Sequence, residues 1–350
     1  MRLLNKHHHS TKQPTKSSFF ITKKYDEKNI LNYNSLIPKP ILYVKNLSKK
    51  YFGKKHPTIH NISFNVYPGE FHAFIGANGA GKTTTIKCLI GAYASWNGTI
   101  LVNGIRNNKE EAKKKLGYIP ENARFPEKIS AIKYLQWMTM LSGLTRKQSK
   151  EFSINKLRDL RMWSLRNKSP NNFSSGQKKK ILLAQALIHD PDIIVMDEPV
   201  ANLDPKARNE FFNILKGLLK RDKAIFISSH VLAELDLYAN SVTILDGGKI
   251  IYDGDKKTLM TKFFKHQYEI STDNNEFTKA FLKKEKIKYS WRPEDKTIVA
   301  VFSDSTKVTI FQKNLIKHNI TFTKFTKVEP TLDEVYNKLV IKGSVDTQKG

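Results

Sequence analysis

The chain has 350 residues, of which 39% are hydrophobic and 26% charged, a balance typical of a soluble protein with an apolar core. No run approaches the roughly 18 apolar residues that span a bilayer, and the single cysteine, Cys88, excludes an internal disulfide. The net charge of +28 favours an anionic partner: nucleic acid, a phosphorylated ligand or an acidic membrane face. A lysine-rich bias spread over a solvated surface explains the same surplus.

The composition and the apolar pattern of the N-terminal part change near residue 41. Residues 1–40 are basic with little apolar periodicity, so we expect a flexible extension. Strands are predicted over 41–44 and 62–66, with turn signals between them. The apolar run 71–75 leads into a glycine-rich turn, and residues 83–90 are typical of a helix. Strand, loop and helix in this order predict the start of a parallel α/β unit.

The middle of the chain combines helical and strand-like segments. Ser130 is placed to cap a helix that ends near Gly143, and the stretch 125–172 is predicted to be a helical insertion. The apolar runs 193–196 and 224–227 are typical of strands covered on both faces.

The last third begins with a predicted hairpin, and a separate group of strand-like and helix-like segments follows it. Residues 242–245 and 249–252 flank the turn sequence Asp-Gly-Gly, which favours a hairpin. Beyond it, residues 298–302 and 308–310 are strand-like and 332–340 are helix-like. We expect residues 265–350 to form a small α+β accessory domain.

The turn after the third predicted strand carries the strongest motif. Residues 76–83 fit G-x-x-x-x-G-K-[ST], a loop whose backbone N–H groups hold phosphates at a helix N-terminus. Lys82 adds positive charge at the outer phosphates, and the Thr83 hydroxyl binds Mg²⁺. The expected phosphate-binding residues are Gly76, Ala77, Asn78, Gly79, Ala80, Gly81, Lys82, Thr83 and Thr84.

A pair of carboxylates follows the apolar run 193–196. Asp197 ends this strand, which we expect to lie next to the P-loop strand, so that the carboxylate approaches the metal. Glu198, one residue later, is placed to polarise an attacking water. Solvation of a loop is the alternative role for such a pair, and the nearby P-loop favours the catalytic one.

Further motifs resemble those of one family. Residues 173–177 resemble the L-S-G-G-Q signature of the ATP-binding-cassette (ABC) ATPases, residues 201–204 resemble the D-loop, and His230 resembles the switch histidine. Together the motifs cover about residues 41–254. The resemblance implies an α/β fold: a P-loop NTPase core with an antiparallel β subdomain and a helical insertion, forming a nucleotide-binding domain over 41–264.

The resemblance also implies roles for individual residues. ATP and Mg²⁺ are the expected ligands, with Glu198 as general base and His230 at the γ-phosphate. Tyr51 is expected to stack on adenine, the alternative being a tyrosine at the edge of the core. Asp204 links the two sites of a dimer, and the signature contacts ATP held by the other subunit. The signature residues are Ser174, Ser175, Gly176 and Gln177.

Two positions depart from the family pattern. Ser175 replaces the first signature glycine, and its Cβ makes close phosphate approach less assured. Glu121, in a segment that resembles the Q-loop, stands where glutamine is usual; it can face Mg²⁺ or water but cannot donate an amide hydrogen bond. We therefore expect retained but tuned hydrolysis.

Residues 329–336 resemble the C-terminal helix of ATPases that serve type-2 ABC exporters, the alternative being a generic packing helix. The expected function is that of an ATP-hydrolysing subunit at the cytoplasmic face of the cell membrane. Its partners would be a separate transmembrane permease, a second ABC ATPase subunit (identical or different), and possible anionic lipid. Export is the expected direction.

Two other functions stay open at this point. A non-transport ABC ATPase acting on the ribosome or nucleic acid is favoured by the positive charge, but such relatives usually carry two cassettes or a long coiled coil. A catalytically weak ATP-binding regulator is suggested by Ser175 and Glu121, whereas the intact Lys82, Asp197 and Glu198 argue against it.

Overall fold

The computed structural model describes residues 39–122, 124–263 and 266–347. The expected flexible extension, apart from Lys39 and Pro40, lies outside these described residues. Within them, no helix combines the length and apolar character needed to cross a bilayer.

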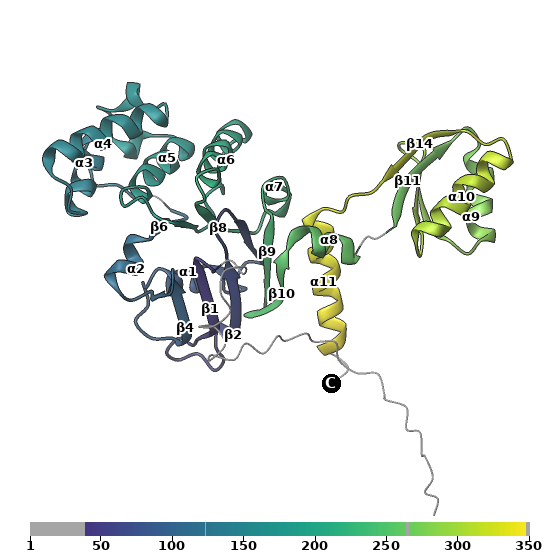
Figure 1. The fold of residues 1–350 in the computed structure, drawn as a ribbon, viewed down its shortest axis with the longest axis horizontal. Coiled ribbons are helices and arrows are strands. Elements are labelled where there is room, and N and C mark those ends of the chain that lie inside the picture. Colours follow the sequence, from purple (N-terminus) through teal and green to yellow (C-terminus); the bar gives the residue numbers. More distant parts are fainter. Residues whose placement is uncertain (1–38, 123, 264–265, 348–350) are drawn as a thin grey trace, which may run out of the picture. The chain divides into compact units, whose positions relative to one another are not determined.

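A six-stranded sheet forms the centre of residues 41–263 (Figure 1). Five of its strands are parallel, and β10 pairs antiparallel with β9 as the predicted hairpin. In sheet order the strands are β10 (Lys249–Asp255), β9 (Ser241–Asp246), β3 (Phe71–Ile75), β8 (Ala224–Ser229), β7 (Ile193–Met196) and β6 (Leu116–Ile119). The expectation that the strand before Asp197 lies next to the P-loop strand is wrong, because β8 pairs with both and separates β7 from β3.

An antiparallel sheet packs on one face of the central sheet. Its order is β2 (Ile59–Val66), β1 (Leu42–Lys49), β4 (Asn97–Val102) and β5 (Ile105–Arg106). The rings of Phe64 from β2, Phe74 from β3 and Phe226 from β8 meet with centroids 5.2–5.6 Å apart. Burying one such side chain contributes about 1.5–3 kcal/mol. Helix α1 (Lys82–Leu89) adds Ile86 and Leu89 to this apolar cluster.

Helices cover the other face of the central sheet. Strand β3 alternates, so Phe71, Ala73 and Ile75 point into a second cluster, away from Phe74. This cluster includes residues of α5 (Ser175–Ala186) and α6 (Pro205–Leu219). Short helices α2 (Glu110–Lys114), α7 (Leu232–Asp236) and α8 (Lys256–Phe263) complete the region.

The helical insertion contains α3 (Ala131–Leu141) and α4 (Arg146–Asp159), followed by short 3₁₀ turns over 163–165 and 170–172. Ser130 is the N-cap of α3 by position, but its side chain makes no cap hydrogen bond. Thr145 caps α4 with a complete capping box, its hydroxyl accepting from the N–H of Gln148.

The region after α8 has an apolar cluster of its own. It follows the βαββαβ order of ferredoxin-like domains, with α9 and α10 on one face of its sheet (Figure 1). The elements are β11 (Gln267–Thr272), α9 (Asn275–Lys284), β12 (Lys288–Arg292), β13 (Thr297–Val301), α10 (Ser305–Lys317) and β14 (Phe322–Lys327). The strand expected over 308–310 is wrong: Asp304 caps α10, whose buried Val308, Phe311 and Leu315 follow the helical period.

The final helix, α11 (Leu332–Thr347), starts at the residue predicted. Its Leu332 and Val335 belong to the apolar cluster on the helix-covered face of the central sheet. The accessory cluster, by contrast, is built from residues between Tyr268 and Phe325. The boundary of the accessory domain stays a prediction, and its last helix packs with the preceding region.

We predict that Gly117→Ala destabilises the fold. A Cβ at Gly117 on β6 would lie 2.7 Å from the carbonyl oxygen of Ala186 in α5, so helix or strand must shift. The expected loss is about 1–3 kcal/mol in the free energy of unfolding, measured by urea denaturation. Gly217→Ala is the control: its Cβ meets nothing within 4 Å, and removing a helical glycine should add about 0.5–1 kcal/mol. An unchanged stability of Gly117→Ala would contradict this packing.

Candidate functional site

A cavity of about 440 Å³ lies where the carboxyl ends of the central parallel strands meet the N-terminus of α1. It gathers residues from the P-loop, from the ends of β6, β7 and β8, and from the loop before α6. The lining residues are Thr58, Asn78, Gly79, Gly81, Lys82, Thr83, Thr84, Glu121, Glu198, Ala201, Asn202 and His230. In open α/β sheets this edge is the usual ligand position.

The P-loop backbone needs glycine at particular points. Gly79 and Gly81 have φ values of 81° and 111°, in the left-handed region that side chains disfavour. A Cβ on Gly81 would also lie 2.6 Å from Cγ2 of Ile59. Helix α1 starts at Lys82 with no acidic residue in its own first turn, and its positive end faces the cavity. This is the arrangement that binds phosphate.

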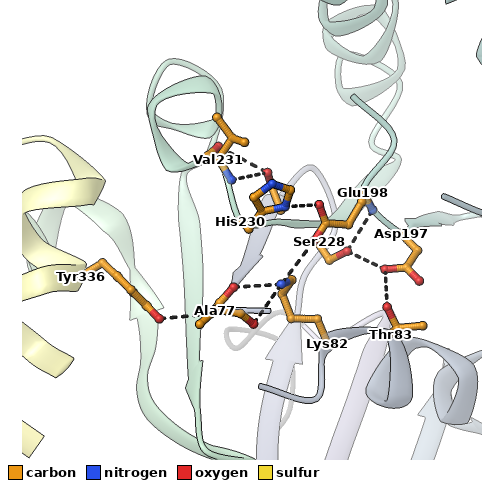
Figure 2. Close-up of polar contacts among 11 residues, drawn as sticks. Ala77, Lys82, Thr83, Asp197, Glu198, Ser228, His230, Val231 and Tyr336 are labelled. Carbon is orange, nitrogen blue, oxygen red and sulfur yellow. Dashed lines mark hydrogen bonds and ion pairs between the residues drawn. The ribbon is translucent and has the colours of Figure 1, made fainter. Parts of the chain in front are cut away.

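The Lys82 ammonium is held by backbone carbonyls of the P-loop (Figure 2). Its Nζ donates to the carbonyl oxygens of Gly76 at 2.8 Å and Ala77 at 3.3 Å. Oε1 of Glu198 lies 3.2 Å away, although the lysine side chain is only 5% exposed. A buried ammonium requires partners of this kind. All three partners are oxygen atoms, and the oxygens of a phosphate group could take their place around the ammonium.

Asp197 accepts two hydrogen bonds through one oxygen. Thr83 Oγ1 donates to Oδ1 at 3.2 Å, and Ser228 Oγ donates to the same atom at 2.9 Å. Ser228 also accepts from the N–H of Glu198 at 3.0 Å. Strand β8 thus bridges the gap between β3 and β7. Ser228 had no role predicted from sequence, although it lies only two residues before His230.

The Thr83 and Asp197 oxygens fit a magnesium ion. Mg²⁺ prefers oxygen ligands and is commonly held by one or two carboxylates together with substrate phosphates. The described residues contain no cluster of three or more His, Cys, Asp or Glu that could hold a metal ion. Glu121 also lines the cavity, and its role near the metal or its water stays a prediction.

Glu198 joins the lysine to the histidine. Its Oε1 faces Lys82, while Oε2 is hydrogen-bonded to Nδ1 of His230 (Figure 2). The residue has a φ of 45°, which is uncommon for a non-glycine side chain and is held here by the Ser228 contact to its N–H. Strain of this kind concentrates at functional sites.

Tyr51 lies beside the cavity but is not part of its lining. Its hydroxyl hydrogen-bonds Thr84 Oγ1 at 3.1 Å and the Tyr93 hydroxyl at 2.8 Å. Its ring meets that of Tyr93 edge to face, with centroids 5.7 Å apart. The proposed adenine contact therefore sits next to the helix that follows the P-loop.

The signature residues and Asp204 are not among the cavity-lining residues. Ser174 and Gln177 form a capping box at the start of α5, and Asp204 caps α6 by accepting from Ala207 N–H at 2.9 Å. Ser175 is the first residue of α5, with an ordinary negative φ, so its Cβ causes no backbone strain. Gly176 carries the steric requirement, because a Cβ there would lie 2.8 Å from that of Ala207.

A buried lysine ties the signature helix to the Q-loop segment. Lys179 Nζ donates to the carbonyl oxygens of Pro120 at 2.7 Å and Glu121 at 2.5 Å. Burial lowers the pKa of Lys179 from its ordinary 10.5 to about 8, although the charges of Glu121 and Asp197 oppose the shift. Burial, with the same two carboxylates, raises the pKa of Tyr118 to about 12.

The lowered pKa of Lys179 gives a signed pH prediction. Between pH 8 and 10.5 the unfolded chain binds more protons at this residue than the folded chain, so the residue's contribution to stability rises with pH. The difference in free energy of unfolding between wild type and Lys179→Met should therefore grow in favour of wild type from pH 8 to pH 10, as measured by urea titration at several pH values. A constant or shrinking difference would contradict the shift.

Comparisons with known proteins agree with this geometry. The family model described as "ABC transporter" matches residues 59–201. A putative ABC transporter ATP-binding protein of Mycoplasma pneumoniae is 40% identical over 311 residues, covering 86% of this chain and 92% of that protein. The Nod factor export ATP-binding protein I of Cupriavidus metallidurans is 32% identical over 222 residues, covering 63% of this chain and 73% of that protein.

Solved structures show the same fold. The structure of an ATP-binding subunit of an ABC transporter is 30% identical, with a TM-score of 0.58, and covers 64% of this chain and 93% of that one. The predicted fold class and the resemblance drawn from the motifs are confirmed. The chain belongs to the family of ABC transporter ATP-binding proteins and is an ATPase of the ATP-binding-cassette type.

Proposed function

We propose that this chain hydrolyses Mg²⁺-bound ATP in the cavity at the P-loop and uses the cycle to drive a separate membrane permease in export. The observation that carries the proposal is the convergence of Lys82 and His230 on the two oxygens of Glu198. Next to this triad, Thr83 and Asp197 offer oxygens suited to the magnesium ion, which would neutralise phosphate charge.

The catalytic role of Glu198 follows from its competing contacts. In the structure the carboxylate is paired with the Lys82 ammonium. The outer phosphates of ATP attract the same ammonium, and their greater charge draws it away from the carboxylate. Glu198 Oε1 is then free to accept a proton from the attacking water, while His230 holds Oε2.

A second ABC ATPase subunit completes the site. Ser174, Gly176 and Asp204 lie outside the cavity of their own chain, and Ser174 is exposed. A signature loop from a partner subunit would contact the γ-phosphate and close the dimer over ATP. Only the difference in nucleotide affinity between closed and open forms can perform work on the permease.

The helical insertion offers a surface for the permease. Trp137 and Leu141 on α3 are 49% and 80% exposed, and large exposed apolar side chains commonly mark contact sites. Export is supported by the likeness to the Nod factor export protein. We place the complex at the cytoplasmic face of the cell membrane, where the positive chain also faces anionic lipid.

Replacing the proposed general base should separate hydrolysis from binding. Glu198→Gln is expected to lower Mg²⁺-dependent ATP hydrolysis by about 100-fold or more, within the range of general-base contributions, while ATP binding persists. Phosphate release and calorimetric titration measure the two effects. Glu151→Gln, an exposed change of the same type on α4, should leave both unchanged. Wild-type hydrolysis by Glu198→Gln would refute the assigned role.

The permease surface can be tested by capture. Leu141→Glu should reduce co-purification of a multi-spanning membrane protein from gently solubilised cells, because a charge is placed in an apolar contact. Ile316→Glu on α10, at a side chain 62% exposed, is the matched control and should retain the partner. Stoichiometric ribosomal proteins or salt-sensitive nucleic acid without a membrane protein would instead support the non-transport alternative.

A further inference from the structure

One peptide unit of the P-loop is held from both sides (Figure 2). Its carbonyl, that of Gly76, accepts from Lys82 Nζ at 2.8 Å. Its N–H, that of Ala77, donates to the hydroxyl oxygen of Tyr336 at 3.0 Å. Because the peptide group is planar, the carbonyl and the N–H cannot rotate independently. Tyr336 and Lys82 therefore act on the same rigid group.

The tyrosine contacts the loop without occupying the ligand position. The cavity is lined by Asn78 and Gly79 but by neither Ala77 nor Tyr336. Burial raises the pKa of Tyr336, against the opposing effect of the Ala77 N–H, so the phenol is neutral throughout the physiological range. A neutral hydroxyl behind the loop supports the peptide and leaves the phosphate-facing N–H groups available.

The helix that carries Tyr336 is fixed at its first turn. Thr331 N–H donates to Glu334 Oε2 at 3.2 Å, and Glu334 N–H donates to Thr331 Oγ1 at 3.3 Å, which makes a reciprocal capping box. Leu332 and Val335 are fully buried in the apolar cluster on the helix-covered face of the central sheet. Tyr336 follows Leu332 by about one turn, so it points to the same side.

The same turn contacts the segment after the switch histidine. Leu332 N–H donates to Asp236 Oδ2 at 3.4 Å, at the end of α7. Helix α7 starts at Leu232, two positions beyond His230. Helix α11 thus contacts the P-loop at Ala77 and the far end of the short helix that follows His230.

We propose that Tyr336 is a positioning residue for the nucleotide site, which orients the Gly76–Ala77 peptide and through it the Lys82 ammonium. The generic packing role considered for this helix is met by its apolar side chains and by the ring of Tyr336, whereas the hydroxyl adds a specific contact to the P-loop. The expected effect on ATP binding and kinetics rests on the proposed role of Lys82. The orientation of the Gly76–Ala77 peptide by Tyr336 does not depend on that role.

The structural part is tested by amide hydrogen exchange in the protein without nucleotide. Tyr336→Phe removes the hydroxyl and keeps the ring that packs on the core. Loss of one hydrogen bond should speed exchange at the Ala77 amide by about 2- to 12-fold, with exchange of the α11 amides unchanged. Tyr289→Phe, the same change on β12 of the accessory region, should leave the Ala77 amide at its wild-type rate. An unchanged rate in Tyr336→Phe would overturn the proposal.

The functional part is tested by titration and kinetics on the same variants. Tyr336→Phe should weaken ATP binding and raise the KM for ATP by a similar 2- to 12-fold, with a smaller change in kcat, because the anchor of Lys82 is loosened. Tyr289→Phe should match wild type. Faster Ala77 exchange with wild-type ATP affinity and KM would overturn the link to Lys82, even if Glu198→Gln has abolished hydrolysis as the proposed function requires.

Discussion

The site depends on one buried charge. The Lys82 ammonium is withdrawn from water and is held by Glu198 and by two carbonyl oxygens of its own loop. A lone ammonium at this depth would be strongly unfavourable, so the glycine turn and the strand that ends at Glu198 must be positioned together. The central sheet achieves this by bringing the ends of β3 and β7 to one edge, with β8 between them.

Further hydrogen bonds connect the groups around Lys82 to other parts of the molecule. Ser228 on β8 links Asp197 to the backbone of Glu198, and Lys179 links the signature helix to the carbonyls of Pro120 and Glu121. Helix α11 contacts the P-loop through the Tyr336 hydroxyl, which accepts from the N–H of Ala77 (Figure 2). A shift of the segment around Glu121, of α5 or of α11 would therefore move groups that line or adjoin the cavity. Coupling of this kind is what the proposed function requires.

The sequence predicted what is encoded locally. The P-loop and the strand before Asp197 could be recognised because their chemistry lies within a few consecutive residues, and the motif order indicated the family. The interposed β8 and the bridging role of Ser228 depend on strand order, which no local pattern reveals. The β-branched run 308–310 was predicted to be a strand, but its packing against the accessory sheet and the Asp304 cap favour a helix. Tyr336 lies in the segment 329–336 that resembles a family helix, yet its contact with Ala77 arises only in three dimensions.

The central claim is that Glu198 and the phosphates of ATP compete for Lys82. Its most direct test is calorimetric titration of wild type and Glu198→Gln with a non-hydrolysable ATP analogue and with ADP, in the presence of Mg²⁺. Removing the competing charge should tighten binding of the triphosphate analogue more than binding of ADP, because the outer phosphate meets the lysine. Equal or weaker binding of the triphosphate analogue by Glu198→Gln would contradict the account.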